Sequence, residues 1–416
     1  EHQLGSFRPS VQMPDPSFIQ NRRNSLEGLL ITHAHEDHLG AIPYLWPKFE
    51  CPVYATPFAA AMLRYKTQAR TGVLPEPLIE IKPGESIKLG PFDIEFVPIT
   101  HSTPETCALW ITTKNSKLLH TADWKIDTEP VVGEAWSSNR FRVLSREGVD
   151  AIICDSTNAL LSGRSVSEGQ VAIALKDVIA SKAGRVVVGC FSSNIARIQT
   201  ISNIAGETGR HLGILGRSLV GVARCAQQTG LMSRSFKPIH SEHLGYLPRG
   251  EVLALATGSQ GELGAALHRL MADTHPDLAL ESGDTVILSS KTIPGNERLV
   301  ERLSAGFIER GIEVIEADKI ATPLHASGHP CEEELRELYL MMKPKLVVPV
   351  HGERKHMERN AWVARQAGVL SALTGSNGDL FYLSPNPGVR RAFAKVGRIQ
   401  WSVEERRLMR LKEREV

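Results

Sequence analysis

The stretch Leu29-Leu30-Ile31-Thr32-His33-Ala34-His35-Glu36-Asp37-His38 decides the fold class of this 416-residue chain. It opens with a short apolar run that predicts a buried strand, and then places three imidazoles and the Asp37 carboxylate within six residues. Packing these titratable groups together without a metal would cost desolvation or repulsion, so the stretch predicts a metal site. On a tight turn, His33 and His35 point one way and Asp37 and His38 another, which predicts two neighbouring metal ions.

Other predicted strands also end at side chains of the metal-ligand type. Apolar, β-branched runs lead into His101, Asp123, Asp155 and His351. Because sites in layered α/β folds gather beyond the carboxyl ends of the strands, these residues are expected to meet at one active site. Helical patterns over residues 59–70, 169–183 and 332–342 separate the strands, so the fold class is α/β.

The composition restricts the kind of protein. Lys and Arg number 48 and Asp and Glu number 46, so any affinity for nucleic acid has to come from a local patch. The six cysteines show no CxxC spacing, as expected of reduced thiols in a cytosolic protein. No apolar stretch approaches the ~18 residues that span a bilayer, and the first residues show no signal pattern, so the expected location is cytoplasmic.

The motif His33-x-His35-x-Asp37-His38 resembles the signature of the metallo-β-lactamase superfamily. That resemblance implies a four-layered αββα fold and two ligand sets: His33, His35 and His101 for the first ion, Asp37 and His38 for the second, and Asp123 bridging both. His351 fits as the further ligand of the second ion. Imidazole nitrogen and carboxylate oxygen suit two zinc ions, with manganese as the alternative.

A long segment with strand patterns of its own separates Asp123 from His351. Such an inserted α/β domain resembles the β-CASP nucleases, and Asp155, His329 and His351 match their motifs A, B and C. Five stretches also resemble the bacterial ribonuclease J family: residues 32–43, 120–127, 256–262, 290–297 and 325–329.

The resemblance divides the chain into four parts. Residues 1–170 are expected to form the first part of the metallo-β-lactamase domain, 171–320 the β-CASP domain, 321–388 the returning part, and 389–416 a linker or C-terminal helix. The tail over residues 404–415 is helical in composition. The first dozen residues carry no strand pattern, so the N-terminal strands of the family fold, like its C-terminal domain, are expected to be missing.

The family's activity is metal-dependent RNA hydrolysis, with 5′-to-3′ exonuclease and endonuclease action in RNA processing and mRNA decay. The implied nucleophile is a hydroxide that bridges two metal ions. The implied catalytic residues are Asp37, His38, Asp123, His329 and Asp155. His329 is expected to protonate the leaving 3′-oxygen, with simple phosphate contact as the alternative, and Asp155 to orient a metal ligand or His329.

The loop that contains His329 is expected to bind substrate phosphate, including a 5′-monophosphate. The resemblance implies this for His325, Ser327, Gly328 and His329. Composition at strand ends adds Ser192, Ser193, Asn194, Arg197, Ser259 and Gln260, for which turn and helix-cap chemistry is the alternative.

The expected partner is single-stranded RNA, and the family implies a homodimer or homotetramer for a full-length protein. Two rival functions remain open. A β-CASP enzyme that acts on DNA shares every motif, and a non-catalytic RNA-binding scaffold shares the fold.

Overall fold

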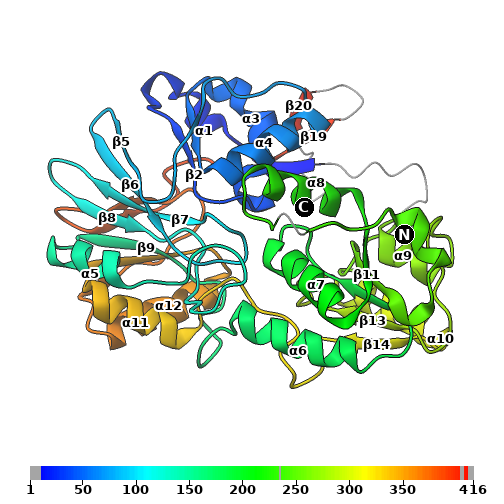
Figure 1. Cartoon of the computed structure of the whole chain (residues 1–416). Coiled ribbons are helices and arrows are strands. Elements are labelled where there is room, and N and C mark those ends of the chain that lie inside the picture. The colour runs from blue at the N-terminus through cyan, green and yellow to red at the C-terminus, as the bar shows by residue number, and fades with distance from the viewer. Residues whose placement is uncertain (1–10, 234–235, 403–406, 411–416) are drawn as a thin grey trace.

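The computed structural model describes residues 11–233, 236–402 and 407–410. Its first unit contains a seven-stranded sheet with the order β16-β15-β9-β8-β7-β6-β5 (Figure 1). The strands are β5 (Ser86–Leu89), β6 (Phe92–Pro98), β7 (Cys107–Thr112), β8 (Lys117–His120), β9 (Ala151–Asp155), β15 (Leu346–Val350) and β16 (Ser371–Ala372). A three-stranded parallel sheet faces it and consists of β2 (Leu29–Ile31), β3 (Val53–Ala55) and β4 (Leu78–Glu80).

Helices cover the outer faces of both sheets. The helices α5 (Asn139–Arg146), α11 (Glu332–Met342) and α12 (Arg354–Gln366) pack on the seven-stranded sheet, and α3 (Ile42–Phe49) and α4 (Pro57–Arg70) lie on the three-stranded sheet. Between the sheets, Ile94, Phe96 and Leu109 are buried against Leu30 and Tyr54. The predicted αββα fold is confirmed.

The second unit is the inserted α/β domain. Its parallel sheet has the order β11-β12-β10-β13-β14, with β10 (Val186–Gly189), β11 (His211–Leu215), β12 (Val252–Ala256), β13 (Thr285–Leu288) and β14 (Glu313–Glu316). Helices α6 (Glu168–Ala180), α7 (Ile195–Thr208) and α8 (Arg217–Gln228) cover one face, and α9 (Ala266–Met271) and α10 (Glu297–Glu309) cover the other. Because both faces are covered, every residue of β10 and β12 is buried and apolar or glycine.

A continuous apolar cluster joins the two units. Met62 and Leu63 of α4 belong to the same buried cluster as Val222 and Cys225 of α8. A Cβ added at Gly221 would clash with the Tyr65 ring, so glycine is what allows the close approach of these helices. The shared core fixes the inserted domain against the first unit.

The two ends of the chain pair with each other, and they correct the expectation of a helical tail. The strand β1 (Val11–Pro14) pairs with β19 (Arg398–Ser402), which pairs with β20 (Arg407–Arg410), so the described part of the predicted tail helix is a strand. The apolar side chains of Met13, Tyr44 and Ile399 are buried together, and this packing overrides the helical composition. Residues 403–406 and 411–416 lie outside the described part of the chain.

The remaining elements are short. They are α1 (Ser17–Gln20), α2 (Glu36–Leu39), β17 (Leu380–Tyr382), β18 (Gly388–Arg390) and the 3₁₀ helices Arg23–Ser25, Ser241–Tyr246 and Arg249–Glu251. None of the helices in the described ranges is long and apolar enough to cross a membrane.

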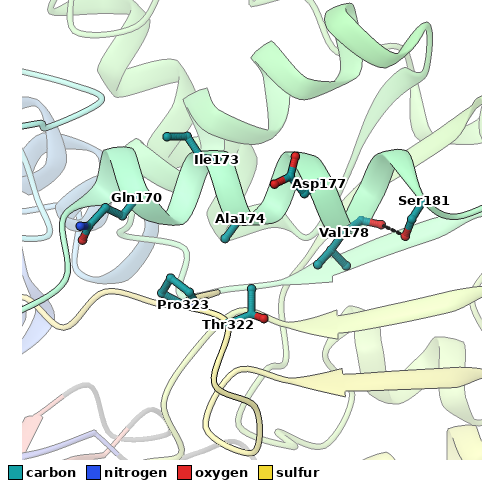
Figure 2. A pocket seen from close by; sticks show the side chains of 8 residues that line it. All are labelled: Gln170, Ile173, Ala174, Asp177, Val178, Ser181, Thr322 and Pro323. Atoms are coloured by element: carbon teal, nitrogen blue, oxygen red, sulfur yellow. Dashed lines mark hydrogen bonds between the residues drawn. The ribbon is translucent and has the colours of Figure 1, made fainter.

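A groove of about 550 Å³ follows α6 where the chain returns from the inserted domain (Figure 2). Ile173, Ala174 and Val178 line it together with Thr322 and Pro323. None of its lining residues is a predicted metal ligand or RNA contact, so the groove is separate from the candidate site.

Candidate metal centre

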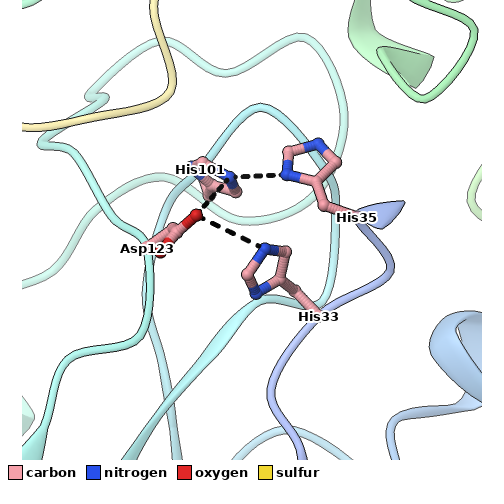
Figure 3. A group of neighbouring side chains, drawn as sticks. All are labelled: His33, His35, His101 and Asp123. Carbon is pink, nitrogen blue, oxygen red and sulfur yellow. Dashed lines mark hydrogen bonds and ion pairs between the residues drawn. The ribbon is translucent and has the colours of Figure 1, made fainter. Parts of the chain in front are cut away.

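The carboxyl ends of strands from both sheets of the first unit deliver the predicted ligands to one place. The first set comprises His33, His35, His101 and Asp123, whose donor atoms all lie within 4.8 Å of one another (Figure 3). His33 and His35 follow β2, whereas His101 follows β6 and Asp123 follows β8. Strands that are distant in the sequence thus build one tetrad.

Hydrogen bonds fix how the imidazoles of this tetrad point. Nδ1 of His101 lies 2.5 Å from the Gly328 carbonyl oxygen, to which it donates, so its Nε2 keeps a lone pair. That Nε2 lies 2.9 Å from Nδ1 of His35. Nδ1 of His33 bonds to the Thr32 hydroxyl at 3.0 Å, and its buried Nε2 has no hydrogen-bond partner. These nitrogens converge as the ligands of a metal ion would.

Burial keeps the three imidazoles neutral. It lowers the pKa of His35 to about 4, and it also holds the pKa values of His33 and His101 well below the ordinary value, with neighbouring histidines adding to the effect. A neutral imidazole is the form that binds a metal. The tetrad therefore fits a divalent ion in both geometry and protonation.

The second set comprises Asp37, His38, Asp123 and His351, again with donor atoms within 4.8 Å of one another. Nε2 of His351 lies 3.3 Å from Oδ2 of Asp37, and Nε2 of His38 lies 3.6 Å from the same oxygen. Burial opposes ionisation of Asp37, but the hydrogen bond from His351 and the charges of His38 and His35 together outweigh it and lower the pKa of the carboxyl group. The same bond raises the pKa of His351 to about 9.

Asp123 belongs to both sets. Its Oδ2 lies 3.2 Å from Nε2 of His38 and 3.7 Å from Nε2 of His351, both in the second set. The same oxygen lies 3.7 Å from Nε2 of His33 and 3.9 Å from Nε2 of His101, both in the first set. A carboxylate between two groups of imidazoles has the placement that a bridging ligand needs.

Asp155 and His329 adjoin the second set. Oδ2 of Asp155 is 2.7 Å from Nδ1 of His329, whereas its Oδ1 is 3.8 Å from Nδ1 of His351. Burial lowers the pKa of His329, but the charge and hydrogen bond of Asp155 together with the charge of Asp123 outweigh burial and raise the pKa above the ordinary value. Asp155 therefore holds the His329 ring through its Nδ1.

The other predicted phosphate-binding residues of this loop lie beside the metal centre. The Gly328 carbonyl is occupied by His101, and a Cβ at this position would meet the His101 ring at 2.5 Å, so the glycine serves the metal ligand. The Ser327 hydroxyl accepts a hydrogen bond from Asn158 at 2.8 Å. Nδ1 of His325 is buried without a partner, and burial followed by the charge of Arg197 lowers the pKa of His325 to about 4.

Arg197 and Asn194 make the structural contacts that the turn and helix-cap alternative expects. Arg197 is fully buried, and it donates to Glu168 at 3.0 Å and to the Leu324 carbonyl at 3.0 Å. Asn194 caps α7 by accepting from the Arg197 amide. Because Arg197 is buried and paired with Glu168, its guanidinium is not exposed to a substrate.

Ser259 and Gln260 are also buried. The Gln260 side chain donates to the Lys291 carbonyl at 3.0 Å and accepts from the Ile293 amide at 2.8 Å. This side chain therefore ties the loop after β12 to the loop after β13. Ser192 and Ser193, by contrast, are half-buried in the turn before α7.

The structure adds residues that the sequence reasoning did not single out. Thr157 contacts both Asp155 and His351. The Asn158 side-chain amide donates to the His329 carbonyl oxygen at 3.2 Å and so holds the loop of His329. The buried carboxylate of Glu334 accepts from the amides of Ile126, Ser165 and Cys331. Thr157 and Asn158 lie two and three residues after Asp155, and this closeness to the motif A residue is the sequence signal that could have pointed to them.

Three family models match successive parts of the chain. A beta-lactamase superfamily domain matches residues 7–145, a ribonuclease J beta-CASP domain matches residues 183–305, and a Zn-dependent metallo-hydrolase RNA specificity domain matches residues 314–369. Fold, site and models together define a metallo-hydrolase of the metallo-β-lactamase superfamily with a β-CASP domain.

Relatives named ribonuclease J are similar along most of the chain. The one from Sinorhizobium meliloti is 42% identical over 398 residues, which cover 95% of this chain and 70% of the relative. The one from Mycobacterium tuberculosis is 34% identical over 380 residues, which cover 90% of this chain and 67% of the relative. The one from Helicobacter pylori is 34% identical over 369 residues, which cover 88% of this chain and 53% of the relative. The chain belongs to the ribonuclease J family.

A solved structure shares the fold. The crystal structure of a protein of unknown function from Enterococcus faecalis superposes with a TM-score of 0.55 at 16% identity, covering 78% of this chain and 75% of that chain. At this identity the likeness concerns the fold alone.

Proposed function

We propose that this chain is a two-metal ribonuclease that hydrolyses RNA from a 5′-monophosphate end and also cleaves internally. The observation that carries the proposal is the position of Asp123, whose Oδ2 lies 3.2 to 3.9 Å from imidazole nitrogens of two separate ligand sets. In the proposed centre, Asp123 bridges both ions, His33, His35 and His101 bind one of them, and Asp37, His38 and His351 bind the other. Zinc is the proposed metal, because neutral imidazoles and carboxylates suit it best.

Two divalent ions at this centre would supply water that ionises near neutral pH and would polarise a phosphoryl oxygen. The protein's own contribution is positional and acid–base. His329, with its Nδ1 held by Asp155 at 2.7 Å, has a raised pKa and can carry a proton on Nε2. We propose that this nitrogen protonates the leaving 3′-oxygen.

The substrate's 5′-phosphate would lie beside His325 and Ser327. The unpartnered Nδ1 of His325 is the buried polar atom that most needs a ligand in this loop. Ser192 and Ser193 remain as further contacts because they are half-buried at the end of β10. Binding of the end of a single strand at this point favours exonuclease action.

The compartment and assembly are also proposals. All six cysteines are buried free thiols, which supports a cytoplasmic location. A homodimer or homotetramer is proposed for the full-length protein on the family resemblance.

The test uses matched 5′-monophosphorylated, 5′-triphosphorylated and 5′-hydroxyl RNAs and a DNA of the same sequence, each incubated with zinc- or manganese-loaded protein. The proposal predicts mononucleotides from the monophosphorylated RNA, slower shortening of the other RNAs, and little cleavage of DNA. Faster cleavage of DNA than of RNA would favour the DNA-directed alternative. No cleavage of any substrate by protein containing two metals per chain would favour the scaffold.

A further inference from the structure

The hydroxyl of Thr157 lies between two functional groups that do not touch each other. Oγ1 of Thr157 is 2.7 Å from Oδ1 of Asp155 and 2.6 Å from Nδ1 of His351. Asp155 and His351 are themselves 3.8 Å apart, which is too long for a hydrogen bond. Thr157 therefore provides the hydrogen-bonded connection between them.

The direction of these hydrogen bonds follows from the number of protons available. Oδ1 of Asp155 also accepts from the Thr157 amide at 2.9 Å, and its Oδ2 faces His329, so the carboxylate acts as an acceptor. A threonine hydroxyl has one proton to donate, and it donates that proton to Asp155. Thr157 then accepts from Nδ1–H of His351. Nε2, the nitrogen that faces Asp37 and Asp123, is then the atom that would give its lone pair to a metal ion, in place of the hydrogen bond that it makes to Asp37 in the absence of metal.

The backbone of His351 supports the same interpretation. His351 has φ of 58°, a left-handed conformation that is uncommon for residues other than glycine. Its carbonyl accepts from the Ser156 amide at 3.3 Å, so residues 156 and 157 hold this histidine through its backbone and its ring. Asn360 in turn is buried and donates to the Asp155 carbonyl at 2.9 Å and to the Ser156 hydroxyl at 3.0 Å. The segment that holds His351 is itself anchored.

We infer that Thr157 is a positioning residue for the second metal ion: its hydroxyl selects the His351 tautomer that presents Nε2 to that ion. The inference rests on the proposed two-metal centre, and it assigns to the second site a dependence on Thr157 that the first site lacks. Residues that orient a metal ligand in this way contribute about 10–100-fold to metal affinity.

The experiment titrates metal-free protein with Co²⁺ and follows its d–d absorption, which reports each ion separately from any RNA cleavage. The variants are Thr157→Val, which keeps the shape and removes the hydroxyl, and Thr157→Ser, which keeps the hydroxyl. We expect wild type to bind two ions, Thr157→Val to bind the second about 10–100-fold more weakly with the first unchanged, and Thr157→Ser to restore near wild-type binding.

The matched control is Thr200→Val, because the Thr200 hydroxyl is buried in α7 without a hydrogen-bond partner. It should bind both ions normally. Equal affinities for both ions in Thr157→Val and wild type, equal weakening of both sites, or failure of Thr157→Ser to restore binding would each overturn the inference. If Thr157→Val does not fold, Thr157→Ala removes the same hydroxyl without a branched side chain. The same weakening of the second site is then expected of Thr157→Ala, and the same results would overturn the inference.

Failure of the proposed function gives a different result. If wild type binds two ions and Thr157→Val loses the second, the inference stands even when neither protein cleaves RNA. If wild type cleaves RNA and Thr157→Val keeps both ions, the inference alone fails.

Discussion

At the scale of single residues, the acidic stretch after β2 contains two neighbouring carboxylates with different environments. Asp37 faces His38 and His351 within 3.6 Å, whereas Glu36 points to the surface, where it pairs with Lys66 and Arg70. Only the first of these carboxylates adjoins the metal ligands. Adjacent residues of one motif therefore provide a substitution and its control.

Asp37→Ala is expected to lose the second ion. Because Asp37 is itself a proposed ligand, RNA hydrolysis should fall by more than about 100-fold, the upper end of the effect of residues that only orient a ligand. The first ion should remain, because His33, His35 and His101 are unchanged. Metal analysis and initial rates measure both effects. Glu36→Gln should behave like wild type, and a similar loss in this control would mean that the defect reflects folding.

His329 allows the acid role to be separated from simple phosphate contact. His329→Ala is expected to slow RNA hydrolysis by about 10²–10⁴-fold, since its proton is needed by a poor leaving group. With a p-nitrophenyl phosphodiester, whose leaving group needs no proton, the loss should be much smaller. Equal losses on both substrates would support the phosphate-contact alternative.

At the scale of elements, a buried ion pair fastens the inserted domain to the segments that connect it. Glu168 at the start of α6 binds Arg197 of α7, and Arg197 also binds the Leu324 carbonyl on the return segment. Burial raises the pKa of Glu168, but the charges of Arg197 and Lys125 outweigh burial and leave it below the ordinary value. The pair therefore holds the two connections in register with the loop of His329.

Arg197→Met should destabilise the protein by about 3–5 kcal/mol, because it leaves Glu168 buried without its partner. The double variant Arg197→Met with Glu168→Leu should lose less than the two single variants summed, as measured by urea unfolding. Lys176→Met, which breaks an exposed pair with Glu207, should have little effect. Additive losses would contradict a coupled pair.

The sign of the pH dependence follows from the lowered pKa of Glu168. Its contribution to stability is complete above the unfolded-state value of about 4.3 and is lost as the pH falls through the lower folded value. Wild type and the double variant should therefore converge in stability at acid pH.

The sequence predicts some elements well because their information is local. The strands β2, β9 and β15 are short apolar runs that lead into ligand-type residues, and this pattern can be recognised from the local sequence alone. The strands β1 and β20 depend on pairing with β19, and β1 is almost 400 residues from it in the sequence. The hydroxyl of Thr157 and the buried state of Arg197 likewise depend on contacts that no local pattern encodes.

At the scale of the whole molecule, the proposed ligands come from segments spread between His33 and His351. A metal that binds only the folded chain stabilises it, by about 2.7 kcal/mol when the free ion exceeds its Kd a hundredfold. The domain boundaries at residues 170, 320 and 388 stay a prediction, although the matched family models begin and end near the first two.

Removing metal with a chelator should therefore lower the midpoint of thermal unfolding by several degrees, and adding zinc should restore it. Asp37→Ala should show a smaller shift, because it retains one site. An unchanged midpoint in wild type would argue against metal binding by the native centre.

The most direct test of the two-metal centre is anomalous diffraction from zinc-loaded crystals, recorded above and below the zinc absorption edge. We predict two peaks, one among His33, His35 and His101 and the other among Asp37, His38 and His351, with the Asp123 carboxylate in contact with both. A single peak, or two peaks that do not share Asp123, would contradict the account.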